Sequence, residues 1–328
     1  MTNTVHPIDC FTSIVVPVTN NAEKITDFIK ELSSVLQETY TNYEIILIDN
    51  GSIDDTVTII QPLLIEYPCI RLIRLSRTYD REIAIFAGLE VSIGDYVITV
   101  IPTSDPISAI PEIVDHLRKG KDIIYGITTK PRHLPLFSRL GLNLFRKYSR
   151  KILGATMPAN STYLIGLNRR AVNAITRIRS HSRHIRILIN QVGFDNKAFP
   201  YTPLKSDPYL ERTLGNSISM AIDISVNYSR HPLRFVSYLG IIASLVNLLY
   251  GVYVVFIYLF DKQVVQGWTT LSLQTSTMFF LVFLILTVLS EYIGRILEET
   301  KEQPSYHVME ELTSTVALAS SSRRNIHK

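Results

Sequence analysis

The sequence predicts an α/β protein with a mostly parallel sheet, followed by two apolar helices long enough to cross a membrane. Three observations lead to this expectation. Strands and helices alternate over residues 13–126, the strand segments are almost continuously apolar, and two later segments carry no charge. Nearly continuous apolar strands are typical of a parallel sheet that helices cover on both faces.

The first half of the chain alternates between the two kinds of element. Short segments rich in apolar and β-branched residues predict strands at residues 13–18, 43–48, 70–75, 96–101 and 122–126. Apolar residues three or four positions apart predict helices at residues 22–37, 54–66, 80–91 and 110–117. Ligands bind beyond the carboxyl ends of such strands, so we expect the site in the loops at residues 17–21, 49–54, 76–81 and 101–106.

Two uncharged segments, residues 235–260 and 271–290, predict transmembrane helices. As helices they would be about 39 and 30 Å long, and the hydrocarbon core of a bilayer is about 30 Å thick. The alternative is a buried hairpin in a soluble core, but globular helices rarely run so long without a polar face. Basic residues precede the first segment and follow the second, which places both termini in the cytosol.

The remaining segments complete the expected domain organisation. We expect an α/β domain at residues 11–205, a juxtamembrane interfacial region at 206–234, and a cytosolic tail at 291–328 in which a short helix leads into a flexible end. Residues 137–154 form a basic amphipathic pattern, which favours a helix lying in the membrane plane over an ordinary surface helix.

Composition limits the classes of function. The net charge of +4 is too small to indicate a nucleic-acid partner, and no nucleic-acid-binding motif is present in the sequence. The two cysteines, Cys10 and Cys69, do not have the spacing of metal ligands and are compatible with a reducing compartment.

The stretch LIDNGSIDDT at residues 47–56 is the most informative motif. Asp49 follows a strand and is placed to accept hydrogen bonds from a base or a sugar, while Gly51 allows a close backbone approach. The alternative is a plain turn, since Asp-Asn-Gly-Ser is a common turn composition.

In combination the motifs resemble glycosyltransferase family 2, and within it the polyprenyl-phosphate branch that includes dolichol-phosphate mannose synthases and bactoprenol glucosyl transferases. The resemblance covers residues 11–308. The segments that carry it are VVPVTNNAEKI (15–25), LIDNGSIDDT (47–56), LSRTYDREIAIFAGLEVSIGDYVI (75–98), NRRAV (168–172), HPLRFVSYLG (231–240) and SEYIGRILEETKEQPSY (290–306).

This resemblance implies a GT-A domain that binds a nucleotide-sugar donor. Such an enzyme transfers the sugar to a polyprenyl phosphate at the cytosolic leaflet, with inversion, here at a bacterial inner membrane. The bilayer is then a partner as well, and a homo-oligomer remains open. Carried over by position, the residues that bind the nucleotide and its phosphates are Pro17, Val18, Asp49, Gly51, Arg77 and Arg81. The alternative for both arginines is surface ion pairing with Asp80 or Glu82.

The chain departs from the family pattern after the fourth predicted strand. Relatives carry an Asp-X-Asp motif there, whose carboxylates hold Mg²⁺ or Mn²⁺ against the diphosphate. Residues 101–106 read IPTSDP and keep one carboxylate, Asp105. We assign Asp105 as a catalytic residue and metal ligand, with a turn before Pro106 as the alternative. Arg81 is the second catalytic candidate, because a cation can stabilise the leaving group where metal ligands are lost. Arg132 and His133 are further cations that could take that part.

A second departure affects the acceptor side. The general base expected in relatives falls at Tyr163, and an arginine of the same motif falls at Ile165. A neutral phenol and an aliphatic side chain cannot do those jobs at neutral pH. Two alternatives to an active transferase therefore stay open: an inactive relative that partners another envelope-glycan enzyme, and a protein that binds a nucleotide sugar without turnover.

Overall fold

The computed structural model describes residues 7–129, 160–178, 185–205 and 306–314, with isolated positions between 242 and 296. The chain divides into two compact units. The first holds Met1–Leu214 together with Pro304–Lys328, and the second holds Gly215–Gln303.

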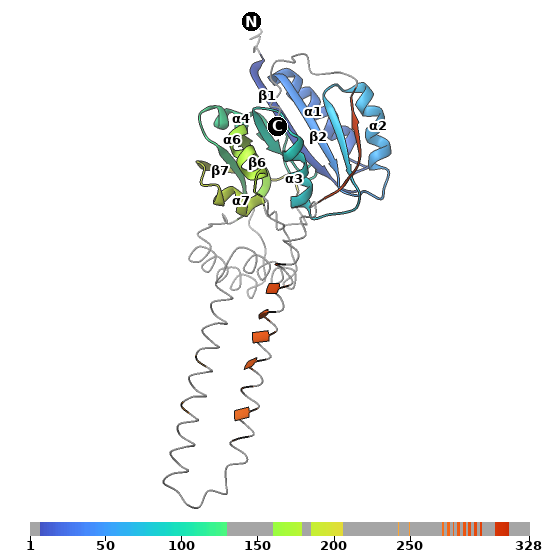
Figure 1. Cartoon of the computed structure of the whole chain (residues 1–328). Coiled ribbons are helices and arrows are strands. Elements are labelled where there is room, and N and C mark those ends of the chain that lie inside the picture. Colours follow the sequence, from blue (N-terminus) through green and yellow to red (C-terminus); the bar gives the residue numbers. More distant parts are fainter. Residues whose placement is uncertain are drawn as a thin grey trace, which may run out of the picture. The chain divides into compact units, whose positions relative to one another are not determined.

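The described part of the first unit is built on one sheet of eight strands in the order β7-β5-β6-β4-β1-β2-β3-β8 (Figure 1). The strands are β1 (Ile8–Val18), β2 (Tyr40–Asp49), β3 (Ile70–Leu75), β4 (Tyr96–Thr99), β5 (Ile123–Thr128), β6 (Ser161–Asn168), β7 (Asn196–Tyr201) and β8 (Val308–Thr313). Strands β4, β1, β2 and β3 run parallel to one another. Strand β6 is antiparallel to both its neighbours, and β8 is antiparallel to β3. The prediction of a mostly parallel α/β sheet is confirmed.

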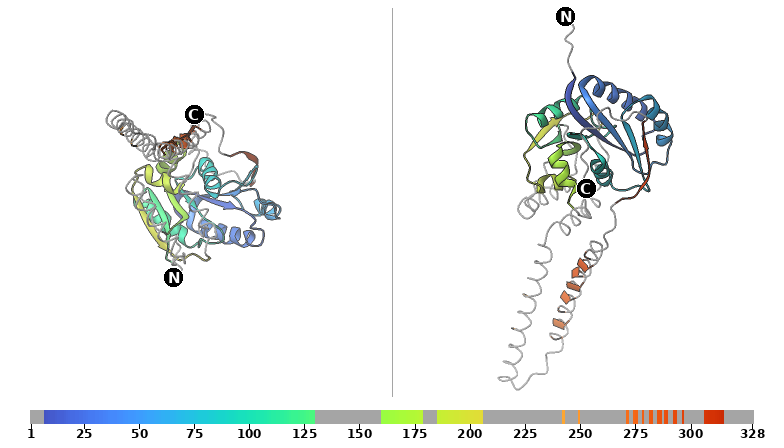
Figure 2. Two further views of the ribbon diagram at one scale, coloured as in Figure 1. Left: turned by 90° about the horizontal axis from the view of Figure 1, so that it is seen from below. Right: turned by 45° about the horizontal axis from the view of Figure 1, so that its top comes forward.

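Helices cover both faces of this sheet, as Figures 1 and 2 show from three directions. The helices α1 (Ile25–Thr39), α2 (Thr56–Glu66) and α4 (Ala109–Arg118) pack on one face, and α3 (Arg81–Val91) and α6 (Arg169–Thr176) pack on the other. Helix α7 (Ile185–Gln191) packs on α6.

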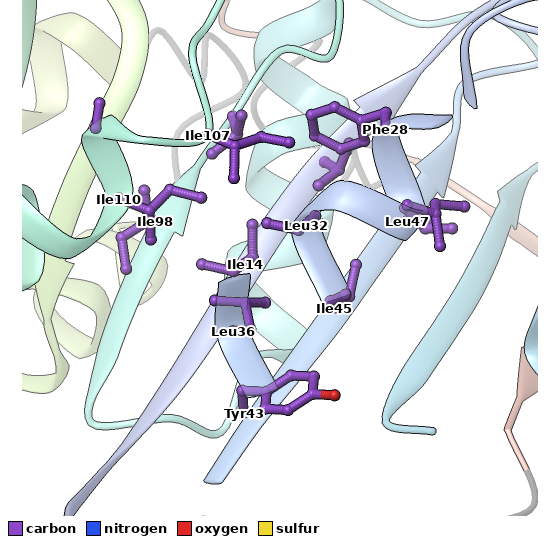
Figure 3. Packing of buried hydrophobic residues seen from close by; sticks show 14 of the residues in the cluster. Ile14, Phe28, Leu32, Leu36, Tyr43, Ile45, Leu47, Ile98, Ile107 and Ile110 are labelled. Carbon is purple, nitrogen blue, oxygen red and sulfur yellow. The ribbon is translucent and has the colours of Figure 1, made fainter. Parts of the chain in front are cut away.

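Strand β1 explains why both faces are apolar. Its buried side chains alternate, so that Ile14, Val16 and Val18 join the α1 side of the core, part of which Figure 3 shows. Val15 points the other way. A Cβ added to Gly88 of α3 would lie 2.3 Å from Val15 Cγ1, so this helix packs too closely against the strand for a larger residue at position 88. A central strand with helices on both sides cannot have a polar face.

The predicted elements of the first half are confirmed in kind, and several ends differ. Strand β3 has the predicted bounds, whereas β1 begins at Ile8 and β4 ends at Thr99. The chain after β4 still follows the sheet for one residue, because Val100 N donates to Val15 O at 2.9 Å. It then enters the turn that contains Asp105.

The expectation of a short helix in the tail is wrong where the tail is described, because residues 308–313 form the edge strand β8. The open edge of β3 offers backbone groups that only an extended segment can pair. Ser76 N donates to His307 O at one end of the strand, and Ser314 N donates to Ile70 O at the other, both at 2.9 Å. A segment after the predicted spans therefore belongs to the same unit as the first half of the chain.

Of the second unit, only isolated helical positions are described. The juxtamembrane region at 206–234 and the basic segment at 137–154 lie outside the described residues, and the predicted spans at 235–260 and 271–290 are described only at scattered helical positions. Within what is described, no helix has the length and apolar character needed to cross a membrane. The described positions do include five exposed apolar side chains three or four residues apart, namely Val282, Leu286, Leu289, Ile293 and Ile296. That spacing places them along one side of a helix.

Candidate active site

The site is built at the carboxyl edge of the parallel strands. Strands β4, β1, β2 and β3 are neighbours in the sheet, so the loops that follow them share this edge. These four loops are the ones in which the sequence predicts the site. The contacts within and between them decide which side chains are available to a ligand.

The loops after β1 and β2 are tied together. Asn20 N donates to Ser52 Oγ at 3.0 Å, and Ile53 N donates back to Asn20 Oδ1 at 3.0 Å. Asn20 takes a positive φ of 51°, which asparagine tolerates better than most residues. The predicted base-pocket residues Pro17 and Val18 are buried at the end of β1, below this junction. The loops after β1 and β2 thus hold each other, and a base pocket lined by Pro17 and Val18 remains a prediction.

Asp49 ends β2 and is buried, with 2% of its surface exposed. Ser52 N donates to its Oδ1 at 3.1 Å, which closes the turn that the motif predicts. Arg74, which the sequence reasoning missed, places its Nε 3.7 Å from Oδ2. The predicted acceptor of the base is therefore a buried carboxylate with one turn bond and one nearby cation.

The residues after Asp49 hold the loop that follows β3. Asn50 makes two backbone bonds to Tyr79, one to its N–H and one to its carbonyl, both at 2.8 Å. Gly51 has φ +67°, and a Cβ there would lie 2.6 Å from Thr78 N. The close approach predicted for Gly51 is an approach to this neighbouring loop. A contact of Gly51 with a nucleotide remains a prediction.

Replacing Gly51 by alanine is expected to weaken donor binding and to lower the free energy of unfolding by about 1–3 kcal/mol. The new Cβ would strain the positive φ and push Thr78 away, so the clamp on Tyr79 would loosen. Calorimetry with a nucleoside diphosphate and urea unfolding of the full chain measure the two effects. Gly120→Ala is the matched control, since it also changes a positive-φ glycine but meets no atom within 4 Å. Equal effects in both variants would show that backbone strain alone is responsible.

The two predicted phosphate-binding arginines lie in the clamped loop and at the start of α3. Arg77 is exposed, and its guanidinium carbon lies 4.9 Å from the ring centre of Tyr79. A hydrogen bond from Ser76 and the nearby charge of Arg77 lower the pKa of Tyr79. Arg81 is the first residue of α3, with its guanidinium carbon 5.6 Å from the ring centre of Tyr163. Both cations therefore stack on aromatic rings at the predicted edge.

Asp105 is held inside the turn that follows β4. Its Oδ2 accepts from Ile101 N at 2.8 Å, and its Oδ1 accepts from the hydroxyl of Tyr201 at 2.5 Å. Only 2% of its surface is exposed. These contacts are those of a turn carboxylate, which is the alternative the sequence left open.

The described residues do not form a set that fits Mg²⁺ or Mn²⁺. Both oxygens of Asp105 already accept protein hydrogen bonds. Within the described ranges, no group of three or more His, Cys, Asp or Glu side chains is placed to hold an ion. A hard cation needs several oxygen ligands, so Asp105 as a metal ligand remains a prediction without support from its contacts.

A buried polar cluster, which the sequence did not predict, joins Glu82, Tyr163 and Arg186. Glu82 Oε1 lies 3.2 Å from the hydroxyl of Tyr163 and 3.1 Å from Arg186 Nη2. The guanidinium carbon of Arg186 also lies 4.7 Å from the centre of the Tyr163 ring. Burial acts to lower the pKa of Arg186, but its electrostatic interactions with Tyr163 and Glu82 raise the pKa overall, so the guanidinium stays charged.

This cluster occupies the place where relatives are expected to carry their base. Tyr163 is 1% exposed, and Ile165, which replaces the expected arginine, is fully buried. The cation here comes from Arg186 on α7 instead. No local pattern links these residues, although an arginine within the apolar sequence IRILI was a signal of a buried charge partner.

The sequence pattern of glycosyl transferase family 2 matches residues 13–176, half of the chain, and the chain belongs to that family. The prediction of a family 2 glycosyltransferase is confirmed.

Three relatives extend this comparison over nearly the whole chain. The chain is 28% identical over 300 residues to the uncharacterized glycosyltransferase YkcC of Bacillus subtilis, covering 90% of this chain and 92% of the relative. It is 26% identical over 301 residues to the bactoprenol glucosyl transferase of Shigella phage SfV, covering 91% and 98%. It is 27% identical over 322 residues to the undecaprenyl-phosphate 4-deoxy-4-formamido-L-arabinose transferase of Pectobacterium atrosepticum, covering 95% and 96%. The last two names belong to the polyprenyl-phosphate branch that the sequence resembles.

Proposed function

We propose that the protein is a membrane-anchored glycosyltransferase that moves a sugar from a nucleotide-sugar donor to a polyprenyl phosphate at the cytosolic leaflet, with inversion. The observation that carries the proposal is the buried carboxylate of Asp49 at the carboxyl edge of the sheet, between two interlocked loops. A carboxylate there suits the N–H donors of a base. The relatives named for bactoprenol and undecaprenyl phosphate support the acceptor class.

In this reaction the cations act on the donor's diphosphate. An oxygen of the lipid phosphate attacks the anomeric carbon, and the bond from that carbon to the donor diphosphate breaks. The electron pair passes to the departing diphosphate, and we assign the stabilisation of its charge to Arg81 and Arg77, whose guanidinium groups lie near tyrosine rings. Attack from the face opposite to the leaving group inverts the anomeric carbon.

The departures from the family pattern are compatible with this chemistry. The acceptor phosphate is already ionised near neutral pH, so no proton must be removed before it attacks. A tyrosine at position 163 therefore does not prevent the step. The charge of the leaving group still has to be neutralised, which makes the two arginines the side chains on which the proposal most depends.

The membrane part of the proposal rests on sequence and on exposed apolar side chains. Residues 235–260 and 271–290 are uncharged. The described positions Val282, Leu286 and Ile293 expose apolar side chains that a bilayer would cover. Basic residues outside both segments support a cytosolic position for both termini.

Replacing Asp49 by asparagine is expected to raise the KM for the donor about 10- to 100-fold, because a charged hydrogen bond to the base is lost. The measurement is transfer of radiolabelled sugar from UDP- or GDP-sugars to undecaprenyl phosphate by the full chain in nanodiscs. Asp55→Asn is the matched control, since Asp55 is an exposed carboxylate of the same motif without a side-chain cap bond.

Three outcomes of this assay, run together with calorimetry of donor binding to the wild type, separate the proposed function from its alternatives. If Asp49→Asn and Asp55→Asn transfer sugar as the wild type does, the assignment of the base pocket is wrong. Binding of a donor by the wild type without transfer would favour the protein that binds without turnover. No binding at all would favour the inactive partner, which the internally bonded Asp105 and the apolar Ile165 also suggest.

A further inference from the structure

The C-terminal strand β8 lies along β3, the strand whose following loop belongs to the proposed donor site. It pairs antiparallel with β3, so that Arg74 is opposite Glu310 and Ile73 is opposite Glu311. Just before this strand, His307 N lies 3.2 Å from the hydroxyl of Tyr79. Tyr79 is the residue whose backbone Asn50 clamps. His307 and β8 together thus contact both strand β3 and the loop that follows it.

Arg74 connects this strand to the predicted base acceptor. Its Nη1 donates to Glu310 Oε2 at 2.9 Å, and its Nε lies 3.7 Å from Asp49 Oδ2. The first distance is that of a charged hydrogen bond, and the second is beyond hydrogen-bond range. The guanidinium is therefore hydrogen-bonded to β8 and attracts Asp49 through its charge alone.

The carboxylates of Asp49 and Glu310 differ in exposure, and this difference gives them different roles. The side chain of Asp49 is 2% exposed and that of Glu310 is 39% exposed. A direct hydrogen bond from Arg74 to Asp49 would occupy an oxygen that a base needs. Because the guanidinium is hydrogen-bonded to Glu310, Arg74 Nε stays 3.7 Å from Asp49 Oδ2 and makes no hydrogen bond to it.

We propose that Arg74 is a positioning residue for Asp49, and that Glu310 holds Arg74 at the distance that keeps the carboxylate open to the base. The inference rests on the proposed function and assigns β8 a part in donor binding. Without Glu310, the guanidinium turns toward Asp49 and competes with the N–H groups of the base. Donor affinity falls, and the chemical step is expected to be unchanged because both residues act through Asp49, which the proposal assigns to the base.

The neighbouring ion pair on the same strand supplies a matched control. Glu311 is 43% exposed and binds Arg71 at 2.8 Å, so it resembles Glu310 in exposure and in partner. Arg71, however, reaches Glu44, whose carboxylate accepts from Ser13 and from the backbone of Ile93. Glu311→Gln therefore removes an equivalent charge from β8 without touching Asp49.

The experiment compares Glu310→Gln with Glu311→Gln in the full chain in nanodiscs, by calorimetry with UDP and with GDP. For whichever diphosphate the wild type binds, we expect Glu310→Gln to raise the Kd about tenfold and Glu311→Gln to change it less than about twofold. The double variant Arg74→Gln with Glu310→Gln removes the competing cation and should bind more tightly than Glu310→Gln alone. Melting curves of both single variants check that β8 is retained equally.

If Glu310 had only a structural role, its replacement would not give this pattern of Kd values. The inference predicts that transfer assays of Glu310→Gln show a raised donor KM and an unchanged kcat. Equal Kd values for the two single variants, or a double variant no better than Glu310→Gln, would overturn it. If Asp49→Asn weakens binding while Glu310→Gln does not, only this inference fails. If the wild type binds neither UDP nor GDP, the proposed function fails together with it.

Discussion

Replacing Arg186 by methionine is expected to lower the free energy of unfolding by about 3–5 kcal/mol, the cost of breaking a buried ion pair. Arg186 is largely buried and binds Glu82, which is 2% exposed, at 3.1 Å. The change deprives a buried carboxylate of its ion-pair cation and removes the guanidinium stacked on Tyr163. Urea unfolding of the full chain, followed by circular dichroism, measures the loss.

The control for Arg186 is an exposed arginine with the same kind of partner. Arg170 binds Asp122 at 2.7 Å, but its side chain is 74% exposed. Exposed pairs contribute about 0–1 kcal/mol, so Arg170→Met should barely change the transition. If Arg186→Met is as mild as this control, the buried cluster does not stabilise the fold. The double variant Glu82→Gln with Arg186→Met should recover part of the loss, because no charge then remains unbalanced in the pair.

Replacing Asp105 by alanine is expected to cost about 2–4 kcal/mol, because it takes the acceptor from two buried donors. These donors are the N–H of Ile101 and the hydroxyl of Tyr201. Tyr201→Phe removes the bond from the tyrosine alone and should cost about 1 kcal/mol, because the bonds from Ile101 N and from Ser104 Oγ stay. Unfolding by urea separates the two values.

The same variants test whether Asp105 holds a metal ion. A turn carboxylate predicts that Tyr201→Phe leaves transfer intact, and that transfer by the wild type persists in EDTA. Activity that EDTA abolishes and Mn²⁺ restores, together with an Asp105→Ala variant of normal stability but no activity, would instead establish Asp105 as a ligand. The structural contacts and the family pattern make opposite predictions here.

The sequence predicted the parallel core because its signals are local. Strand β3 and helix α3 have the predicted kind, and Asp49 and Gly51 lie at the predicted edge. The spacing of apolar residues along the chain is enough to predict such elements, because it shows which faces of a strand or a helix are buried. Strand β8 was not predicted, because its sequence, VMEELT, is half polar. It forms a strand only by pairing with β3, which is distant in the sequence.

The predicted site was right in its loops and incomplete in its contacts. The sequence predicted Asp49, Arg81 and Asp105 as residues of the site. It did not predict that Arg74 lies near Asp49, that Arg186 pairs with Glu82 beside Arg81, or that Tyr201 binds Asp105. These partners come from strands and helices far along the chain, so only the fold brings them together. Arginines inside an apolar strand such as IRLIRL were the one local sign, since a half-buried cation needs a carboxylate nearby.

The position of β8 also bears on any shortened version of the chain. Cutting before residue 306 removes the strand that caps β3 and exposes a row of unpaired backbone groups. Such an edge recruits strands from other molecules, so the shortened protein would tend to aggregate or exchange segments. A water-soluble catalytic fragment therefore needs residues 306–314 joined back to residues 7–205 through a linker.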